Sequence, residues 1–142
     1  MAKPLAAVKA LDHLVITCTN VSKTAEWYSR YLGMTTETFT SPSDPKTVRT
    51  ALRFGQQKIN LHQKAKEFEP KANTALPGTA DLCFLVEEGI DLDKLVEELQ
   101  QERIDVLEGG SPSERTGALG PIRSVYIRDP DGNLIELSHY IK

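Results

Sequence analysis

The chain has 142 residues, of which 39% are hydrophobic and 26% charged, and its formal net charge is −3 at pH 7. These values are ordinary for one globular domain, and the length is sufficient to bury a hydrophobic core. The charges are interspersed and form no basic block, which argues against nucleic-acid binding. No apolar run reaches the roughly 18 residues of a membrane-spanning helix, and the N-terminus lacks the features of a signal peptide. We therefore expect a cytoplasmic protein with no membrane partner.

The two cysteines, Cys18 and Cys83, both lie within apolar runs. A free cysteine in such a run commonly behaves as a small buried hydrophobe. We expect both to be reduced, and a single disulfide between them is the alternative.

The first half of the chain predicts a strand, a helix and then further strands. Residues 11–19, LDHLVITCT, are rich in β-branched residues and predict a strand. Apolar residues recur at helical spacing over 22–32, and Gly33 is well placed to end that helix. The remaining predictions for this half are a short strand ending at Phe39, a loop over 41–45, and a hairpin of strands 47–55 and 58–63.

The pattern restarts after a polar stretch over 65–78 that contains Pro70 and Pro77 and is typical of a linker. A strand over 80–86 opens the second half. The elements predicted after it are a helix with an apolar face of Leu92, Leu95, Val96 and Leu99, a short strand at 104–107, a Gly/Ser/Pro-rich loop over 109–120, and a hairpin of strands 124–129 and 133–140.

Both halves thus have the order strand, helix, three strands, and their first and last strands can be aligned. Placing His13 on Asp81 matches HLVITC with DLCFLV, and placing Asn60 on Glu136 matches the last strands. Neither half can cover its own sheet, so we expect the two to pack together. We predict an α+β fold of two βαβββ modules, at about 9–64 and 79–141, within one domain spanning 1–142.

The candidate chemistry lies in the first and last strand of each half, at His13, Asn60, His62, Asp81 and Glu136. Side-chain alternation puts Asn60 and His62 on one face of their strand, and directs Glu136 away from the apolar face of its own strand. Imidazole and carboxylate together suit Zn, Fe, Ni, Co or Mn. From the residues alone, His13 as a hydrogen-bonded strand-edge histidine and Glu136 as a solvent-facing residue remain open alternatives.

Four segments together resemble the glyoxalase-like, vicinal oxygen chelate superfamily. They are LDHLVITCTNVSKTAEWYSRYLGM, LRFGQQKINLHQ, PGTADLCFLVEE and SVYIRDPDGNLIELSHY, and the resemblance extends from about residue 11 to 140. The last segment, with its DPDGN turn and a Glu after Leu-Ile, is the most specific. The sequence is similar to small glyoxalase-domain proteins that carry QKINLHQ and ERTGA segments.

The resemblance implies a fold in which two βαβββ modules form a concave, partly closed mixed sheet, the glyoxalase/bleomycin-resistance/dihydroxybiphenyl-dioxygenase fold. It also implies one divalent metal ion (Zn, Ni, Co, Mn or Fe), held by ligands that match His13 and Glu136 here. The chain departs from the usual pattern at Asp81, where metal-binding members have a histidine, and at Asn60, the counterpart of Glu136. His62 is therefore expected either as a further ligand or as a general base. The expected metal ligands are His13, His62, Asp81 and Glu136, and the expected catalytic residues are His62 and Glu136.

By the same resemblance, Tyr126 is expected to bind substrate, and Arg115 and Asn60 are further residues expected to do so. Arg115 and Thr116 belong to the predicted loop over 109–120, and such loops often close over ligands. A tyrosine that merely covers core, and a solvated loop, are the alternatives.

The implied function is that of a metal-dependent isomerase or lyase acting on a small oxygenated molecule, in a homodimer. Two alternatives are an Fe(II)-dependent ring-cleaving dioxygenase and a non-enzymatic protein that binds a small drug or toxin molecule. Glyoxalase I activity is not expected, because the second histidine and second glutamate of that site are absent.

Overall fold

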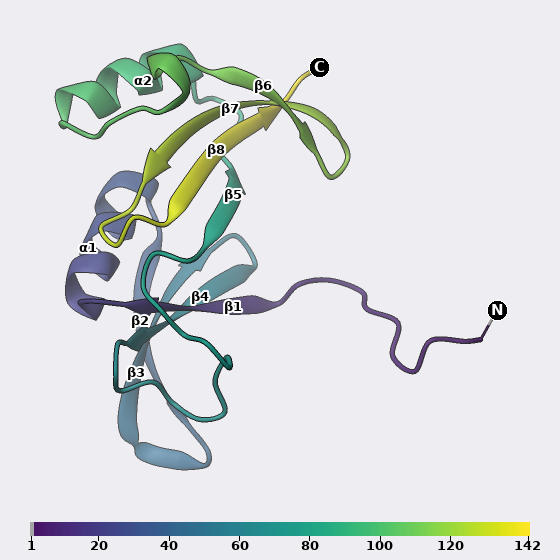
Figure 1. Cartoon of the computed structure of the whole chain (residues 1–142), viewed down its shortest axis with the longest axis vertical. Coiled ribbons are helices and arrows are strands. Elements are labelled where there is room, and N and C mark those ends of the chain that lie inside the picture. The colour runs from purple at the N-terminus through teal and green to yellow at the C-terminus, as the bar shows by residue number, and fades with distance from the viewer. Residues whose placement is uncertain (1) are drawn as a thin grey trace. The chain divides into compact units, whose positions relative to one another are not determined.

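The computed structural model describes residues 2–142 and divides the chain into two compact units, Met1–Ala72 and Asn73–Lys142 (Figure 1). We call them the first and second module. Each consists of a strand, a helix and three further strands, and each has an open four-stranded mixed sheet. The predicted α+β fold of two βαβββ modules is confirmed.

The sheet of the first module has the strand order β1-β4-β3-β2. Strand β1 runs parallel to β4, whereas β3 is antiparallel to both β4 and β2. The elements are β1 (His13–Cys18), α1 (Val21–Leu32), β2 (Thr35–Ser41), β3 (Asp44–Phe54) and β4 (Gln57–Gln63).

Helix α1 begins and ends at the residues that favour such boundaries, and it covers one face of this sheet. The side chain of Asn20 accepts a hydrogen bond from the backbone N–H of Lys23 at 3.0 Å, which caps the first turn. Gly33 ends the helix in the left-handed conformation, with φ of 67°. Tyr28 is fully buried, as are Leu52 and Ile59 of the sheet. The opposite face of the sheet, which carries Asn60 and His62, is therefore the one without a helix of its own module.

The second module repeats this arrangement with the strand order β5-β8-β7-β6. Strand β5 is parallel to β8, and the other two pairs are antiparallel. The elements are β5 (Asp81–Leu85), α2 (Leu92–Gln101), a 3-10 turn (Glu108–Gly110), β6 (Ser113–Gly117), β7 (Gly120–Arg128) and β8 (Leu134–Tyr140).

Two local predictions were wrong in the second module, and one local prediction was imprecise in the first module. The predicted strand at 104–107 is irregular, because the N–H of Ile104 bonds back to the carbonyl of Leu99 at the end of α2. The first of the three strands after α2 is instead β6, within the predicted loop over 109–120, where it pairs with the early part of β7. The predicted loop over 41–45 is shorter, since β2 extends to Ser41 and β3 begins at Asp44.

The Asp129–Asn133 turn ties the last hairpin to the first strand of the second module. Asp129 Oδ1 accepts from the N–H groups of Asp131 and Asn133, both at 2.9 Å, and its Oδ2 accepts from the Asn133 side chain at 2.7 Å. Asn133 Oδ1 in turn accepts from the N–H of Ala80 at 2.9 Å. A Cβ on Gly78 would lie 2.5 Å from the Asp131 carbonyl oxygen, so this approach needs glycine.

Cys18 and Cys83 form no disulfide with each other, as predicted, but only Cys18 is buried, and Cys83 is exposed. Cys83 lies on the face of β5 that carries Asp81, away from the helix. No helix within residues 2–142 has both the length and the apolar character needed to cross a membrane.

Candidate functional site

The strand registers show that the two modules place their candidate residues at corresponding positions. In the first module Val15 of β1 pairs with Asn60 of β4, and in the second Cys83 of β5 pairs with Glu136 of β8. His13 and Asp81 both lie two residues before these pairs, so the alignment made from the sequence agrees with the hydrogen-bonded registers.

His13 opens strand β1 as an exposed side chain. Its Nδ1 atom lies 2.8 Å from Oδ2 of Asp12. A carboxylate on one ring nitrogen orients an imidazole and leaves the other nitrogen, Nε2, available to a ligand. The ring of His13 is therefore oriented by its own neighbour in the sequence.

His62, in contrast, is buried, with 7% of its surface exposed. Its ring meets the Phe68 ring edge-on at a centroid distance of 5.2 Å. Burial lowers the pKa of His62 below its ordinary value, and the nearby charge of Arg49 lowers it further. The imidazole is thus kept neutral, as a general base requires, and the adjacent cation disfavours a divalent metal ion at this position.

Two polar atoms near His62 are buried without a hydrogen-bond partner in the described part of the chain: Nε of Arg49 and Oδ1 of Asn60. The guanidinium carbon of Arg49 lies 4.1 Å from the centroid of the Phe68 ring. One atom is a donor and the other an acceptor. Because unpaired buried polar atoms are costly, such a pair indicates a place for a polar ligand.

In the second module, Glu136 receives a row of hydroxyl groups. Ser124 Oγ donates to Glu136 Oε2 at 2.5 Å, and the Ser138 hydroxyl lies 2.7 Å from Ser124 and 3.5 Å from the same carboxylate oxygen. Cys83 Sγ lies 3.4 Å from Ser138 Oγ. Because Ser124 uses its one hydrogen on Glu136, Ser138 donates either to Ser124 or to the same carboxylate oxygen. Both hydroxyl groups are thus directed toward Oε2 of Glu136.

Tyr126 pairs with Glu136 across the β7–β8 ladder, and Arg115 lies on the neighbouring strand. Partial burial raises the pKa of Tyr126, and the negative charge of Glu136 raises it further. The guanidinium carbon of Arg115 lies 5.3 Å from the Tyr126 ring centroid, and its Nη2 atom lies 3.4 Å from Oε2 of Glu108. Arg115 and Thr116 belong to strand β6, which corrects the prediction of a loop over 109–120.

Asp81 is exposed at the start of β5, next to Leu134 of β8. Within the described residues of either module, no group of three His, Cys, Asp and Glu side chains gathers in the manner of a metal site.

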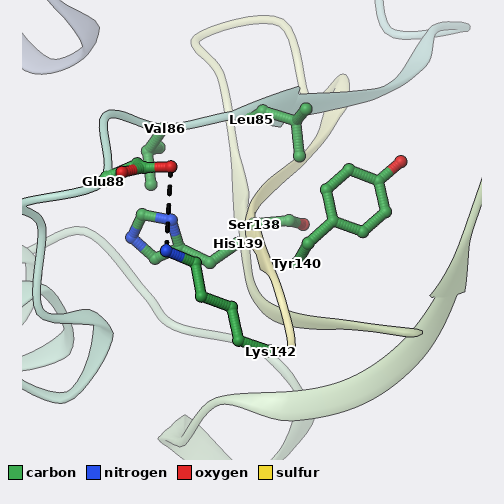
Figure 2. A pocket seen from close by; sticks show the side chains of 7 residues that line it. All are labelled: Leu85, Val86, Glu88, Ser138, His139, Tyr140 and Lys142. Carbon is green, nitrogen blue, oxygen red and sulfur yellow. Dashed lines mark ion pairs between the residues drawn. The ribbon is translucent and has the colours of Figure 1, made fainter. Parts of the chain in front are cut away.

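A pocket of about 330 Å³ lies at the C-terminal ends of β5 and β8 (Figure 2). Figure 2 shows Ser138 and Tyr140 on one side of it, and His139 beside the ion pair of Glu88 and Lys142, whose charged atoms lie 3.9 Å apart. Ser138 also belongs to the hydroxyl row of Glu136, so this pocket adjoins the far end of that row. Its residues are Leu85, Val86, Glu88, Ser138, His139, Tyr140 and Lys142.

Several residues of these two faces were not anticipated. Ser124 and Cys83 share the alternation of Tyr126 and Asp81, so the strand pattern could have placed them beside Glu136. Arg49 also has the right alternation on its strand. Phe68 lies in the polar stretch predicted to be a linker, where no local pattern indicates a packed aromatic ring.

The sequence profile of the Glyoxalase/Bleomycin resistance protein/Dioxygenase superfamily matches residues 10–137. The chain belongs to this superfamily, whose members often use a divalent metal. It is 54% identical over 135 residues to a glyoxalase domain-containing protein of Mycosarcoma maydis, a match that covers 94% of this chain and 70% of the relative. It is 50% identical over 134 residues to a virulence protein of Salmonella typhimurium, covering 94% and 86%.

The fold is also found in solved structures. The crystal structure of the Salmonella typhimurium virulence protein matches with a TM-score of 0.81 and 46% identity, covering 96% of this chain and all of that one. A protein from the mobile metagenome of V. Pseudocholerae matches with a TM-score of 0.84 and 46% identity, covering 97% and 99%. A lactoylglutathione lyase from Agrobacterium tumefaciens, at 19% identity and a TM-score of 0.64 over 94% and 95% of the chains, shares the fold alone.

Proposed function

We propose that the chain is a divalent-metal-dependent enzyme of the isomerase or lyase type that acts on a small oxygenated organic molecule. The observation that carries this proposal is the environment of Glu136. Hydroxyl groups converge on its carboxylate, yet within residues 2–142 no basic side chain forms an ion pair with it. A carboxylate so placed requires a donor network or a cation.

The proposed ligands are His13 and Glu136, with Asp81 as a third. Their chemistry suits the group: an imidazole with one nitrogen held by Asp12, and carboxylates that prefer hard or borderline metal ions. The metal, when bound, would act as a Lewis acid toward neighbouring oxygen atoms of the substrate.

The protein's own residues would supply the remaining functions. His62, kept neutral by burial and by Arg49, is the proposed general base that removes a proton from the substrate. Tyr126 is protonated at neutral pH, and its raised pKa extends that state to higher pH, so its hydroxyl would donate a hydrogen bond to a substrate oxygen beside Glu136. We further propose a cytoplasmic homodimer.

The test is metal content, measured by elemental mass spectrometry on protein purified without a chelating tag. Wild-type protein should carry close to one metal ion per chain, and His13→Ala and Glu136→Gln should lose it, because a coordinating atom is removed. The matched control is Asn60→Ala, at the position in the first module that corresponds to Glu136, and it should retain the metal.

Zinc, nickel, cobalt or manganese would support the isomerase or lyase, whereas iron would move the proposal to the ring-cleaving dioxygenase. Stoichiometric metal in both ligand variants would refute the assignment of the site. Protein that takes up no metal even after soaking would overturn the enzyme in favour of a binding protein.

A further inference from the structure

We propose that the first module carries a subsite for the anionic group of a small hydroxylated molecule, formed by Arg49, Asn60 and His62. The ligand class is a carboxylate or phosphate with a neighbouring hydroxyl group. The proposal deepens the proposed function, on which its identification as a substrate subsite rests, because it names the charge and the polar group that the substrate would carry.

The three side chains share one face of the sheet. Asn60 and His62 alternate along β4, where they pair in register with Val15 and Thr17 of β1. Arg49 lies on β3, one residue before the Thr50–Leu61 pair, and therefore stands beside His62 on the face away from α1. Strand geometry, rather than a flexible loop, thus brings a cation, an amide and an imidazole together.

Arg49 is a cation without a carboxylate partner among residues 2–142. Its guanidinium group rests on the Phe68 ring, 4.1 Å from the centroid, and its buried Nε–H has no acceptor. Stacking on an aromatic ring fixes the plane of the guanidinium group while leaving its in-plane donors free. Such a group is suited to a planar or tetrahedral oxyanion.

Arg53 shows what an arginine on the same face does when it has a structural role. It lies four residues along β3, and its Nε and Nη2 atoms donate to the two carboxylate oxygens of Glu37 at 2.8 and 3.0 Å. Both arginines have the same strand and orientation, but only Arg49 lacks such a partner. The difference indicates that the partner of Arg49 is a molecule supplied from outside.

Asn60 defines the second requirement. Its Oδ1 atom is buried without a donor, and an amide oxygen satisfies itself by accepting a hydrogen from a hydroxyl or amino group. A carboxylate group alone offers no hydrogen there. A ligand with both an anionic group and a hydroxyl group would satisfy Arg49 and Asn60 together, with His62 beside them.

The test uses metal-free protein, so that it stands apart from the metal-content experiment. Nitrogen-15-labelled protein treated with EDTA is titrated with glycolate, inorganic phosphate and uncharged 1,2-ethanediol, and the side-chain signals of Arg49 Nε–H, His62 and Asn60 are followed by NMR. Glycolate and phosphate, which both carry a hydroxyl hydrogen at neutral pH, should give saturable shifts at all three residues, and ethanediol should give none.

Arg49→Gln should weaken glycolate binding by at least about tenfold, because a charged hydrogen bond is lost. The matched control, Arg53→Gln, should leave binding unchanged. If Arg49→Gln does not fold, Arg49→Lys serves instead, and it too should weaken binding because it lacks the planar donor fork.

Shifts spread over surface lysines, equal binding by Arg49→Gln, or no saturable shift with either anion would overturn the subsite. Anion binding in a protein that takes up no metal would leave the subsite in place and refute the metal-dependent enzyme. Metal uptake without anion binding would refute the subsite and leave the metal-dependent enzyme in place.

Discussion

The two modules share strand order, register and helix position, but the sheet faces without a helix of their own module carry different side chains at corresponding positions. In the first module this face presents Arg49 and Lys58 with the aromatic rings of Phe39 and Phe68, and it buries His62. The second module presents a carboxylate, hydroxyls and a thiol. Glu136 stands where the first module has Asn60.

This difference shows that the repeated fold determines where the side chains of the site lie. The identity of those side chains then determines which ligand is bound. The amide of Asn60 cannot bind a metal as a carboxylate does, and the cation beside it favours anions. A carboxylate surrounded by hydroxyl donors favours a cation in the second module. The proposed metal ligand and the proposed anion subsite are thus corresponding positions adapted to opposite charges.

The largest expected effect concerns what the modules have in common, their buried strands. Ile59 and Ile135 occupy corresponding positions and are both fully buried. Replacing either with Ala should reduce the free energy of unfolding by about 2–5 kcal/mol, since it removes apolar contacts and leaves a cavity. Chemical denaturation would measure both, and a loss below about 1 kcal/mol in either variant would show that the two cores are not equivalent.

The next effect tests the chemistry of the second module. Ser124→Ala removes the hydroxyl that holds Glu136 Oε2, and metal affinity should fall by about tenfold or more because the ligand is no longer oriented. Competition with a coloured chelator would measure the affinity. Ser113→Ala is the matched control, since its buried hydroxyl has no partner among the described residues. An equal loss in both variants would mean that the hydroxyl row does not act through Glu136.

The smallest effect tests the first module through pH. Because the folded pKa of His62 lies below its ordinary value of 6.5, the unfolded chain binds this proton at a higher pH than the folded chain does. The stability contributed by neutral His62 is therefore present above about pH 6.5 and is lost as the pH falls through the folded pKa. Unfolding measured between about pH 8 and 5 should show a shallower decline in His62→Gln. Parallel curves would contradict the buried, neutral histidine.

Most of the fold could be predicted from the sequence because its signals are local. The spacing of apolar residues in α1, the capping of that helix by Gly33, and the turn at Asp129–Asn133 each involve neighbours in the chain. Strand β6 could not be found in this way. Its sequence, SERTG, has no apolar alternation. It forms a strand because its backbone pairs with the edge of β7.

The candidate site was predictable in part for the same reason. Alternation along a strand identifies the face of Glu136 and of Asn60, and the likeness of the two halves gives their equivalence. The contact of Phe68 with Arg49 and His62 depends on how the chain after β4 returns over the sheet. No local sequence pattern specifies the path of this segment. The contact of Phe68 with the sheet therefore could not be predicted, and Phe68 was assigned to a linker.

The pairing of first and last strands has a consequence for how each module assembles. His13 pairs with Lys58, and Asp81 with Leu134, so β1 and β5 cannot join their sheets until the rest of the module has been made. The β3–β4 and β7–β8 hairpins close over short turns and lose little chain entropy in doing so. We expect β1 and β5 to dock after these hairpins have formed and to detach early during local opening. Since His13 and Asp81 sit at the beginning of these strands, a metal ion bound by these two of the proposed ligands would hold β1 and β5 in place.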